Sequence, residues 1–356
     1  MHKLYKQKKV FGGLDGLRFL SISAVIWHHS VGSLSSFTLT QYGFLGVDLF
    51  FVISGFLIVT LLLRERDKNG SISLRSFYIR RSLRIFPLYY GFILGLAAIY
   101  YFLYNQSEFG IGFLNELPIY LFYLANIFPV SLNILWSLAS EEQFYLVWPF
   151  IETYLEKHIF ILIYSCLIVN QLFNFYHKEI SEWMGIEDMS IFQTTFTPIL
   201  LGVLLAHLLN NKPSFRLIAP WIRSYYCSLL WLFGLIITCS LLPNDISGMP
   251  RLFVQIIMTL LVGSVVINEN NVLMPLLLFP PFARVGVISY GVYLFHIHGI
   301  VIAEKLLQKV GIEQGLIVFI FGYSITILIA ETSYRLYEMP FLKLKARFSK
   351  VQQTHM

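Results

Sequence analysis

The sequence predicts an all-α membrane protein, a polytopic bundle of about ten transmembrane helices. Its 356 residues are 56% hydrophobic and only 13% charged, whereas soluble proteins carry about 25% charged residues. The mean hydropathy of +0.67 points to the same class. The apolar runs have the length of bilayer-spanning helices, about 20 residues, and they lack the alternation typical of outer-membrane barrel strands.

Basic residues set the predicted topology, because cytoplasmic loops of membrane proteins are enriched in lysine and arginine. Lysines precede the first span, seven basic residues lie in 64–84, and more follow residue 340, so both termini are predicted to be cytoplasmic. The net charge of +6 therefore reflects topology and does not indicate nucleic-acid binding. The predicted spans, in order, are about 14–33, 43–63, 85–104, 134–155, 159–175, 190–209, 224–242, 250–267, 285–306 and 315–336.

Residues 1–340 are predicted to form one membrane domain, and residues 341–356 a basic cytoplasmic tail. The apolar segment 110–128 is interrupted by polar residues and by Pro118. A full crossing there would invert the topology of everything downstream, so we expect a re-entrant or interfacial helix. We expect no cleavable signal peptide and no transporter-like internal repeat. The three cysteines have no metal-binding spacing, so no metal site is predicted.

The first span carries ionisable residues that a lipid-facing helix would not retain. Each costs about 2.5–3.5 kcal/mol at the bilayer centre on insertion scales. Arg18 and His29 are eleven residues apart, which places them on nearly the same helix face and separates their backbones by roughly 16 Å. This face therefore has a cation at one depth and a titratable base at another. His28 points about 100° away and is expected to be a bystander.

A carboxylate in the second span is the predicted partner of His29. Asp48 lies early in an inward-running span and His29 late in an outward-running one, so both are expected in the outer half of the membrane. A carboxylate beside a histidine fixes its tautomer and raises its basicity, which suits a general base. The alternative is a hydrogen bond that only packs two helices. Gly46 and Gly55 are expected to allow close helix approach.

Two further spans carry polar residues that suggest a chamber within the membrane. Glu141 and Glu142 are adjacent in the fourth span and cannot share one face, so one is expected to face a cavity and the other a partner group or the interface. Tyr290 and His296 lie in the ninth span. Together with His29 and Asp48, these side chains favour a polar site over isolated helix contacts.

An arginine cluster, Arg80, Arg81 and Arg84, is expected at the cytoplasmic start of the third span. Such a cluster can determine topology and bind anionic lipid. It can also bind phosphate, because the arginine fork matches phosphate oxygens. The physical chemistry of the cluster favours neither interpretation over the other.

Several of these motifs occur together in one order along the chain. They are LDGLR at 14–18 followed by His29, GVDLFFVISGF at 46–56, FYIRRSLRIFP at 77–87, WSLASE at 136–141 and SYGVYLFH at 289–296. In this combination the chain resembles the acyltransferase 3 family, integral-membrane enzymes that O-acetylate bacterial surface carbohydrates. The chain ends soon after the last span, so the esterase-like domain fused to some members is expected to be absent.

The resemblance implies an acyl-CoA donor, usually acetyl-CoA, at the cytoplasmic side of the bacterial inner membrane, with no permanently bound cofactor. It implies a sugar hydroxyl as acceptor, on lipopolysaccharide, capsule or peptidoglycan. It also implies functional importance for a set of matched positions, which are Arg18, His29, Arg80, Arg81, Arg84 and Glu141.

One mechanism combines these expectations. The arginine cluster binds the phosphates of coenzyme A, the pantetheine arm passes Arg18, and His29 removes a proton from the acceptor hydroxyl. Asp48 or Glu141 orients His29, while Glu142, Tyr290 and His296 line the site. In an alternative mechanism His29 carries the acyl group transiently. A competing function is a transporter or flippase of a polysaccharide precursor or acyl carrier, and coenzyme A binding would separate the two.

Overall fold

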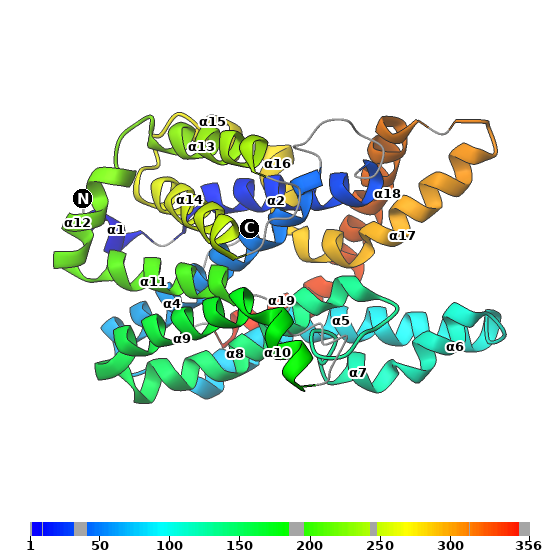
Figure 1. The fold of residues 1–356 in the computed structure, drawn as a ribbon, viewed down its shortest axis with the longest axis horizontal. Coiled ribbons are helices and arrows are strands. Elements are labelled where there is room, and N and C mark those ends of the chain that lie inside the picture. Colours follow the sequence, from blue (N-terminus) through cyan, green and yellow to red (C-terminus); the bar gives the residue numbers. More distant parts are fainter. Residues whose placement is uncertain are drawn as a thin grey trace. The chain divides into compact units, whose positions relative to one another are not determined.

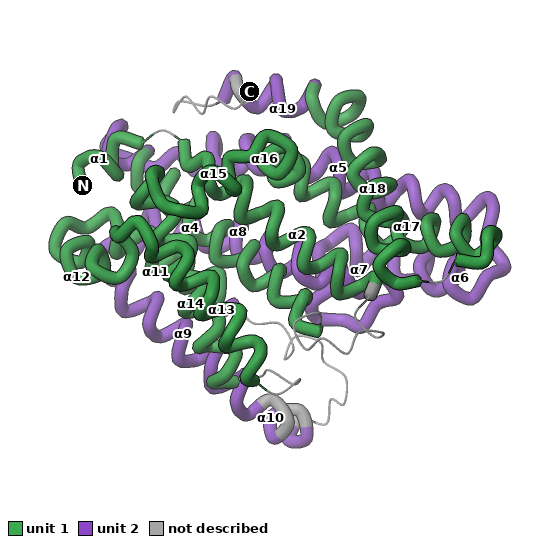
Figure 2. Tube along the Cα trace, turned by 90° about the horizontal axis from the view of Figure 1, so that it is seen from above, with its two compact units in different colours: residues 1–64, 198–339, 351–356 green, residues 65–197, 340–350 purple. Residues whose placement is uncertain are grey.

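In a computed structural model of the chain, the described residues are 2–8, 10–31, 41–184, 196–242, 248–312 and 314–348. Their regular elements are all helical (Figure 1). The chain divides into two compact units, coloured separately in Figure 2. Unit 1 comprises residues 1–64, 198–339 and 351–356, and unit 2 comprises 65–197 and 340–350. Several parts of the predicted topology lie outside the described residues. They include 32–40 between the first two predicted spans, 185–195 before and at the start of the predicted sixth span, and 349–356 of the basic tail.

Unit 1 contains the helices that begin and end the membrane domain. They are α1 (His2–Gln7), α2 (Gly13–Val31), η1 (Tyr42–Phe44), most of α4 (Leu45–Asn69), α11 (Thr197–Asn210), α12 (Lys212–Ile222), α13 (Cys227–Leu241), α14 (Gly248–Ile267), α15 (Met274–Leu277), α16 (Pro280–Val287), α17 (Ser289–Gln308), α18 (Gly315–Ser333) and the π-helical turn η5 (Tyr334–Glu338).

Unit 2 contains the middle of the chain and the last helix. Its elements are α5 (Leu74–Leu103), α6 (Glu108–Asn115), α7 (Leu117–Leu121), η2 (Asn133–Leu135), α8 (Trp136–Tyr154), η3 (Glu156–His158), α9 (Ile159–Phe175), α10 (His177–Met184) and most of α19 (Met339–Ala346).

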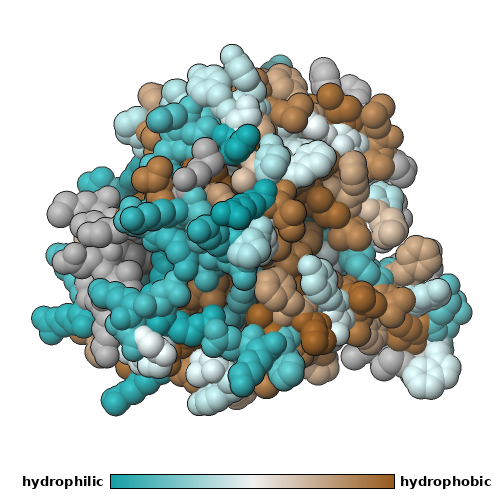
Figure 3. Space-filling model, turned by 90° about the vertical axis from the view of Figure 1, so that its left-hand side faces the viewer, coloured by the Kyte–Doolittle hydropathy of each residue, from teal (hydrophilic) through white to brown (hydrophobic). Residues whose placement is uncertain are grey.

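Each predicted span coincides with a helix, but fewer helices have the length and composition to cross a bilayer. Among the described residues, five helices qualify, or up to seven if each of two bent pairs counts as one span. The bends are 68° between α12 and α13 and 84° between α16 and α17. Only 11% of the apolar window around α9 is buried within the structure, which fits lipid contact. Figure 3 shows hydrophobic side chains exposed beside hydrophilic ones. The total of ten spans and the sidedness of the termini stay predictions.

Two boundaries differ from the sequence-based expectation. The third span was expected to start near residue 85, but α5 begins at Leu74, where Ser73 caps it by accepting a hydrogen bond from Ser76 N. The arginine cluster therefore lies inside α5 and not ahead of it. Residues 110–128 contain α6 and α7, of 8 and 5 residues. Neither is long enough to cross a bilayer alone, since a crossing needs about 20 residues.

Helix α2 is central to unit 1 and packs against α16, α17 and α18 (Figures 1 and 2). Small residues allow its neighbours to approach closely. A Cβ atom on Gly46 would clash with the carbonyl oxygen of Ser21, and one on Gly55 would clash with that of Ile199. The predicted close approach at Gly46 and Gly55 is therefore confirmed.

The contact between α16 and α2 depends on Gly286, which lies against the backbone of Asp15. A Cβ atom at position 286 would overlap the Asp15 carbonyl, so Gly286→Ala is expected to destabilise the protein by about 1–3 kcal/mol, as overpacking does. The melting temperature of the detergent-solubilised variant measures this. Gly234→Ala on α13 is the matched control, because no atom lies within 4 Å of its added Cβ. Equal melting temperatures for the two variants would contradict the prediction.

Several chain segments of unit 1 meet at the end where α2 begins. Lys8 donates to the carbonyl oxygens of Val266 and Ile267 at 3.0 and 3.2 Å, so it caps the end of α14 with a cation. Burial lowers the pKa of the Lys8 ammonium. Arg64, near the end of α4, donates to the Tyr5 carbonyl at 3.3 Å. The start of α2 and the ends of α4 and α14 therefore lie at one end of unit 1.

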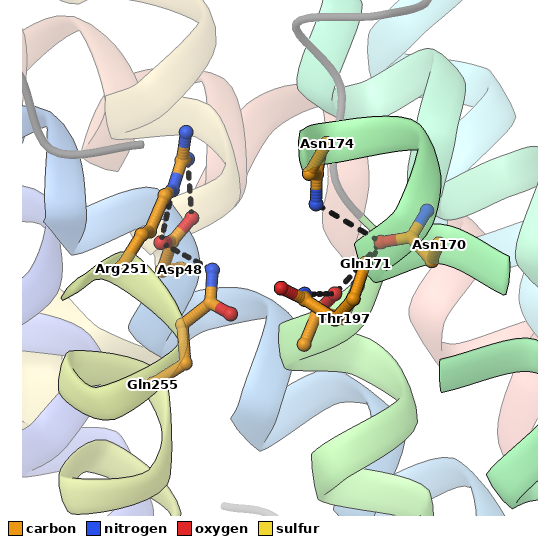
Figure 4. A network of polar contacts seen from close by, with 7 residues as sticks. All are labelled: Asp48, Asn170, Gln171, Asn174, Thr197, Arg251 and Gln255. Atoms are coloured by element: carbon orange, nitrogen blue, oxygen red, sulfur yellow. Dashed lines mark hydrogen bonds and ion pairs between the residues drawn. The ribbon is translucent and has the colours of Figure 1, made fainter. Parts of the chain in front are cut away.

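In unit 2, a set of side-chain amides closes the turn before α11. Asn170 Oδ1 accepts from the hydroxyl of Thr197 at 2.7 Å and from its backbone N–H at 3.2 Å. Gln171 donates to the same hydroxyl at 2.6 Å (Figure 4). These bonds satisfy backbone and side-chain groups at a helix start, where four N–H groups lack intrahelical partners.

Candidate active site

Polar side chains lie near the start, the middle and the end of α2, the helix predicted to carry the functional face. Near its start, Arg18 donates to Asp15 Oδ1 at 2.7 Å, an ion pair between residues three apart whose side chains are 19% and 17% exposed. In the middle, the Ser23 hydroxyl lies 2.8 Å from the Tyr323 hydroxyl of α18. Arg18 and His29 therefore lie near opposite ends of α2, and their functional roles stay predictions.

His29 is held by its own helix in an orientation suited to a base. Its Nδ1 lies 2.9 Å from the Val25 carbonyl oxygen. Because a carbonyl can only accept, Nδ1 carries the proton in the neutral ring and Nε2 carries the lone pair. The ring is exposed. His29 therefore presents an accessible nitrogen base near the end of α2.

The ring of His296 in α17 is in contact with the ring of His29. The two ring centroids are 4.9 Å apart and the ring planes are inclined by 67°. His296 is fully buried, and its Nδ1 is 2.5 Å from the Tyr293 carbonyl oxygen. By the same argument its Nε2 carries a lone pair, and among the described residues this buried nitrogen has no hydrogen-bond partner. The sequence-based grouping of these two histidines agrees with the geometry.

The predicted pairing of Asp48 with His29 is wrong. Arg251 of α14 donates Nε and Nη2 to the Asp48 carboxylate, each at 2.9 Å, and Gln255 Nε2 donates to it at 2.9 Å (Figure 4). Asp48 is completely buried. Its carboxylate thus joins α4 to α14. Asp48 therefore has a helix-packing contact in place of the predicted contact with His29.

The register of α4 against α2 explains the error. Gly43 packs on Ala24 and Gly46 packs on Ser21. Because the helices run antiparallel, Asp48 lies near the level of Phe19, roughly 15 Å along the helix axis from His29 at about 1.5 Å per residue. The sequence assigned both residues to the same half of the membrane but could not fix this register.

His28 was expected to be a bystander, and Tyr290 was predicted to line the site. The His28 ring packs against Phe44, with centroids 5.7 Å apart, and lies 5.3 Å from the His29 ring. Tyr290 is half-buried in the first turn of α17. Nothing in these contacts gives His28 a chemical role, as expected for a bystander.

In unit 2, Arg80 is bound within its own unit. Its Nη2 lies 3.0 Å from Glu65 Oε2, and its Nη1 donates to the Phe348 carbonyl at 3.1 Å. Glu65 is only 3% exposed and also accepts from Ser73 N at 3.1 Å. This network ties the start of α5 to the last part of α4 and to Phe348, which follows α19.

Arg81 lies against the two glutamates of α8. Its guanidinium carbon is 3.8 Å from the Tyr145 ring centroid, a cation–π contact. The Tyr145 hydroxyl donates to Glu141 Oε1 at 3.0 Å, and Arg81 interacts electrostatically with both Glu141 and Glu142. Arg84, one turn further along α5, is half-buried. The charges of the arginine cluster are therefore partly offset by acids of the same unit.

Three residues that shape the site were not identified from the sequence. Arg251 and Gln255 hold Asp48, and Tyr323 contacts Ser23. Arg251 carried a usable signal, since it is a charge at the start of an otherwise apolar span. Within the part of the chain that the structure describes, no group of three or more His, Cys, Asp or Glu side chains could hold a metal ion.

Comparison with known proteins assigns the fold to a family. Residues 11–333 match the family model described as "Acyltransferase domain", the acyltransferase 3 family. The chain belongs to this family. No solved structure matches it.

The relatives of this acyltransferase-family chain include proteins named for O-acetyl transfer. The peptidoglycan O-acetyltransferase OatA of Listeria monocytogenes is 29% identical over 94% of this chain and 56% of its own length. The O-acetyltransferase OatA of Staphylococcus aureus is 29% identical over 96% of this chain and 59% of its own length. A protein of Staphylococcus aureus strain COL, named "Putative O-acetyltransferase SACOL0978", is 30% identical over 95% of this chain and 58% of its own length. The chain thus spans a little over half the length of these relatives.

Proposed function

We propose that this chain is a membrane O-acyltransferase that moves an acyl group, acetyl as the first candidate, from acyl-CoA to a hydroxyl of a cell-surface carbohydrate. The proposal places it in the bacterial cytoplasmic membrane. The observation that carries it is the state of His29 in an acyltransferase-family domain. The ring is exposed, its Nδ1 is committed to the Val25 carbonyl, and its Nε2 lone pair is available to take a hydroxyl proton.

The reaction balances without a resident cofactor. The acceptor hydroxyl gives its proton to His29 Nε2 while its oxygen attacks the thioester carbon. The new C–O bond forms, the C–S bond breaks, and the proton held by His29 neutralises the leaving thiolate of coenzyme A. A transient acyl group on His29 is the alternative course, with the same residue in the role of nucleophile.

Arg18, Arg80 and Arg84 are the proposed donor-binding residues. A guanidinium offers five N–H donors, so Arg80 keeps donor capacity beyond its bonds to Glu65 and Phe348. Arg81 lies beside Glu141 and Glu142, which offset its charge. We therefore expect Arg80 to contribute more to phosphate binding than Arg81.

Arg84→Gln is expected to weaken coenzyme A binding by about 10- to 100-fold, the effect of losing a hydrogen bond to a charged group. Isothermal titration of the purified protein with coenzyme A measures this. Arg75→Gln is the matched control, because Arg75 lies on the same helix and is exposed. Unchanged coenzyme A binding in an Arg80/Arg84 double variant would show that these arginines of α5 do not form the donor site. An absence of coenzyme A binding in the wild type would favour a transport function.

The acceptor is proposed by class. The name of the Listeria monocytogenes relative makes peptidoglycan the first acceptor to test, and lipopolysaccharide or another surface polysaccharide is the second. The test is the content of base-labile O-acetyl esters in purified peptidoglycan and polysaccharide from a deletion strain, complemented with wild type or with His29→Gln. An ester that is lost on deletion and returns only with the wild-type gene supports the function. An unchanged ester content in every fraction would refute it.

A further inference from the structure

We propose that His296 is a positioning residue for His29, taking the supporting role that the sequence argument gave to Asp48. This inference rests on the proposed function, in which His29 is the base. It follows from three observations, which are the ring contact between His29 and His296, the anchoring of each ring through Nδ1, and the buried lone pair on His296 Nε2.

The two hydrogen bonds to backbone carbonyls fix both tautomers. Each Nδ1 donates to a carbonyl oxygen three or four residues earlier on the same helix. Both rings are therefore neutral with the lone pair on Nε2, on the ring edge that points away from the backbone. His296 cannot satisfy its lone pair with solvent, since the residue is fully buried. An unsatisfied buried acceptor costs about 1–3 kcal/mol, so its retention needs a reason.

Proton transfer to His29 supplies that reason. When His29 accepts the hydroxyl proton it becomes an imidazolium, whose ring edges carry positive charge. The neighbouring His296 ring, whose Nε2 is a neutral acceptor, lies in an inclined contact with the His29 ring, with the two ring centroids 4.9 Å apart. This acceptor stabilises the charged state of His29 more than its neutral state, as preorganised dipoles do at sites where charge develops. His296 itself neither gains nor loses a proton.

Among the contacts of His29 and His296 with the described residues, no carboxylate lies where it could take over the stabilisation of protonated His29. His29 is bonded to the Val25 carbonyl, and the acid expected beside it, Asp48, is held by Arg251 and Gln255. The other ring against His296 belongs to Tyr293, at 5.3 Å. A neutral acceptor at this position stabilises the imidazolium without turning His29 into a permanently charged group, which would no longer accept a proton.

Asparagine and glutamine at position 296 separate this role from a structural one. The side-chain amide of asparagine can replace Nδ1 and keep the bond to Tyr293, but it leaves no acceptor at the Nε2 position. Glutamine reaches the Nε2 position with an amide oxygen. We expect His296→Asn to lower kcat by about 10- to 100-fold, as loss of a residue that orients a functional histidine does. His296→Gln should recover most of this loss, and KM for acyl-CoA should stay unchanged in both.

The opposite order of activities would overturn the inference. If His296→Asn is active and His296→Gln is not, the bond to Tyr293 is what matters and the role is structural. His28→Gln is the matched control, since His28 also contacts the His29 ring, at 5.3 Å. It is expected to leave kcat unchanged. A loss in His28→Gln equal to that in His296→Asn would also overturn the proposal.

A second readout does not require turnover. Nitrogen-15 NMR of histidine-labelled protein should show both rings as Nδ1-protonated neutral tautomers, and His29→Gln should shift the Nε2 resonance of His296. An unshifted resonance would show that the rings are not coupled and would overturn the inference. If the wild type transfers no acyl group to any acceptor, the proposed function fails, and the resonance still decides whether the two histidines act as a pair.

Discussion

Replacing His29 with glutamine is expected to lower acyl transfer by about 10²- to 10⁴-fold, the contribution of a positioned general base. Glutamine preserves the size and polarity of the side chain but cannot accept a proton. The loss should appear in kcat, measured with radiolabelled acetyl-CoA and membranes that contain the protein. Expression and melting temperature should stay unchanged, because the His29 side chain is exposed and its hydrogen bond within the described part of the chain is to the Val25 carbonyl of its own helix.

The same variant separates the two courses of the reaction. In direct transfer, labelled acetyl-CoA without acceptor leaves no label on the protein. With His29 as an acyl carrier, the wild type becomes labelled and His29→Gln does not. His158→Gln is a suitable control, because His158 is an exposed histidine outside the site. Full transfer activity in His29→Gln would exclude both courses.

Most of the fold was accessible from the sequence because lipid imposes simple rules on it. Apolar length and basic flanks located a helix at every predicted span. Helix ends were less predictable, since α5 extends to Leu74 through a segment rich in arginine. Its first turns are stabilised by the Ser73 cap and by the ion pair of Arg80 with Glu65. Hydropathy carries no information about such bonds.

Individual residues of the candidate site could be predicted from the sequence, but the contacts between them could not. A histidine in an apolar helix is costly, so both His29 and His296 could be identified from one sequence. The contact between His29 and His296 depends on how α2 packs against α17. The separation of Asp48 from His29 depends on the register that Gly43 and Gly46 set between α4 and α2. Register follows from close packing of small residues, and a sequence shows these residues without the partner atoms they contact.

The largest expected effect on stability concerns Asp48 and Arg251. Arg251→Met leaves the Asp48 carboxylate, which is 0% exposed, without its bidentate partner. Breaking a buried ion pair in this way costs about 3–5 kcal/mol. The variant should therefore express poorly and melt at a markedly lower temperature in detergent. Arg335→Met is the matched control, because that arginine is 72% exposed in its pair with Glu331, and exposed pairs contribute at most about 1 kcal/mol.

A double variant then separates stability from chemistry at Asp48. Asp48→Leu combined with Arg251→Met replaces the buried charges by apolar groups, which is often neutral or stabilising. We expect it to recover most of the lost melting temperature, a coupling typical of residues in contact. If Asp48 only joins α4 to α14, acyl transfer should recover with the fold. If the double variant is stable but has lost kcat as His29→Gln does, Asp48 takes part in catalysis, and the packing role derived from its contacts with Arg251 and Gln255 is incomplete.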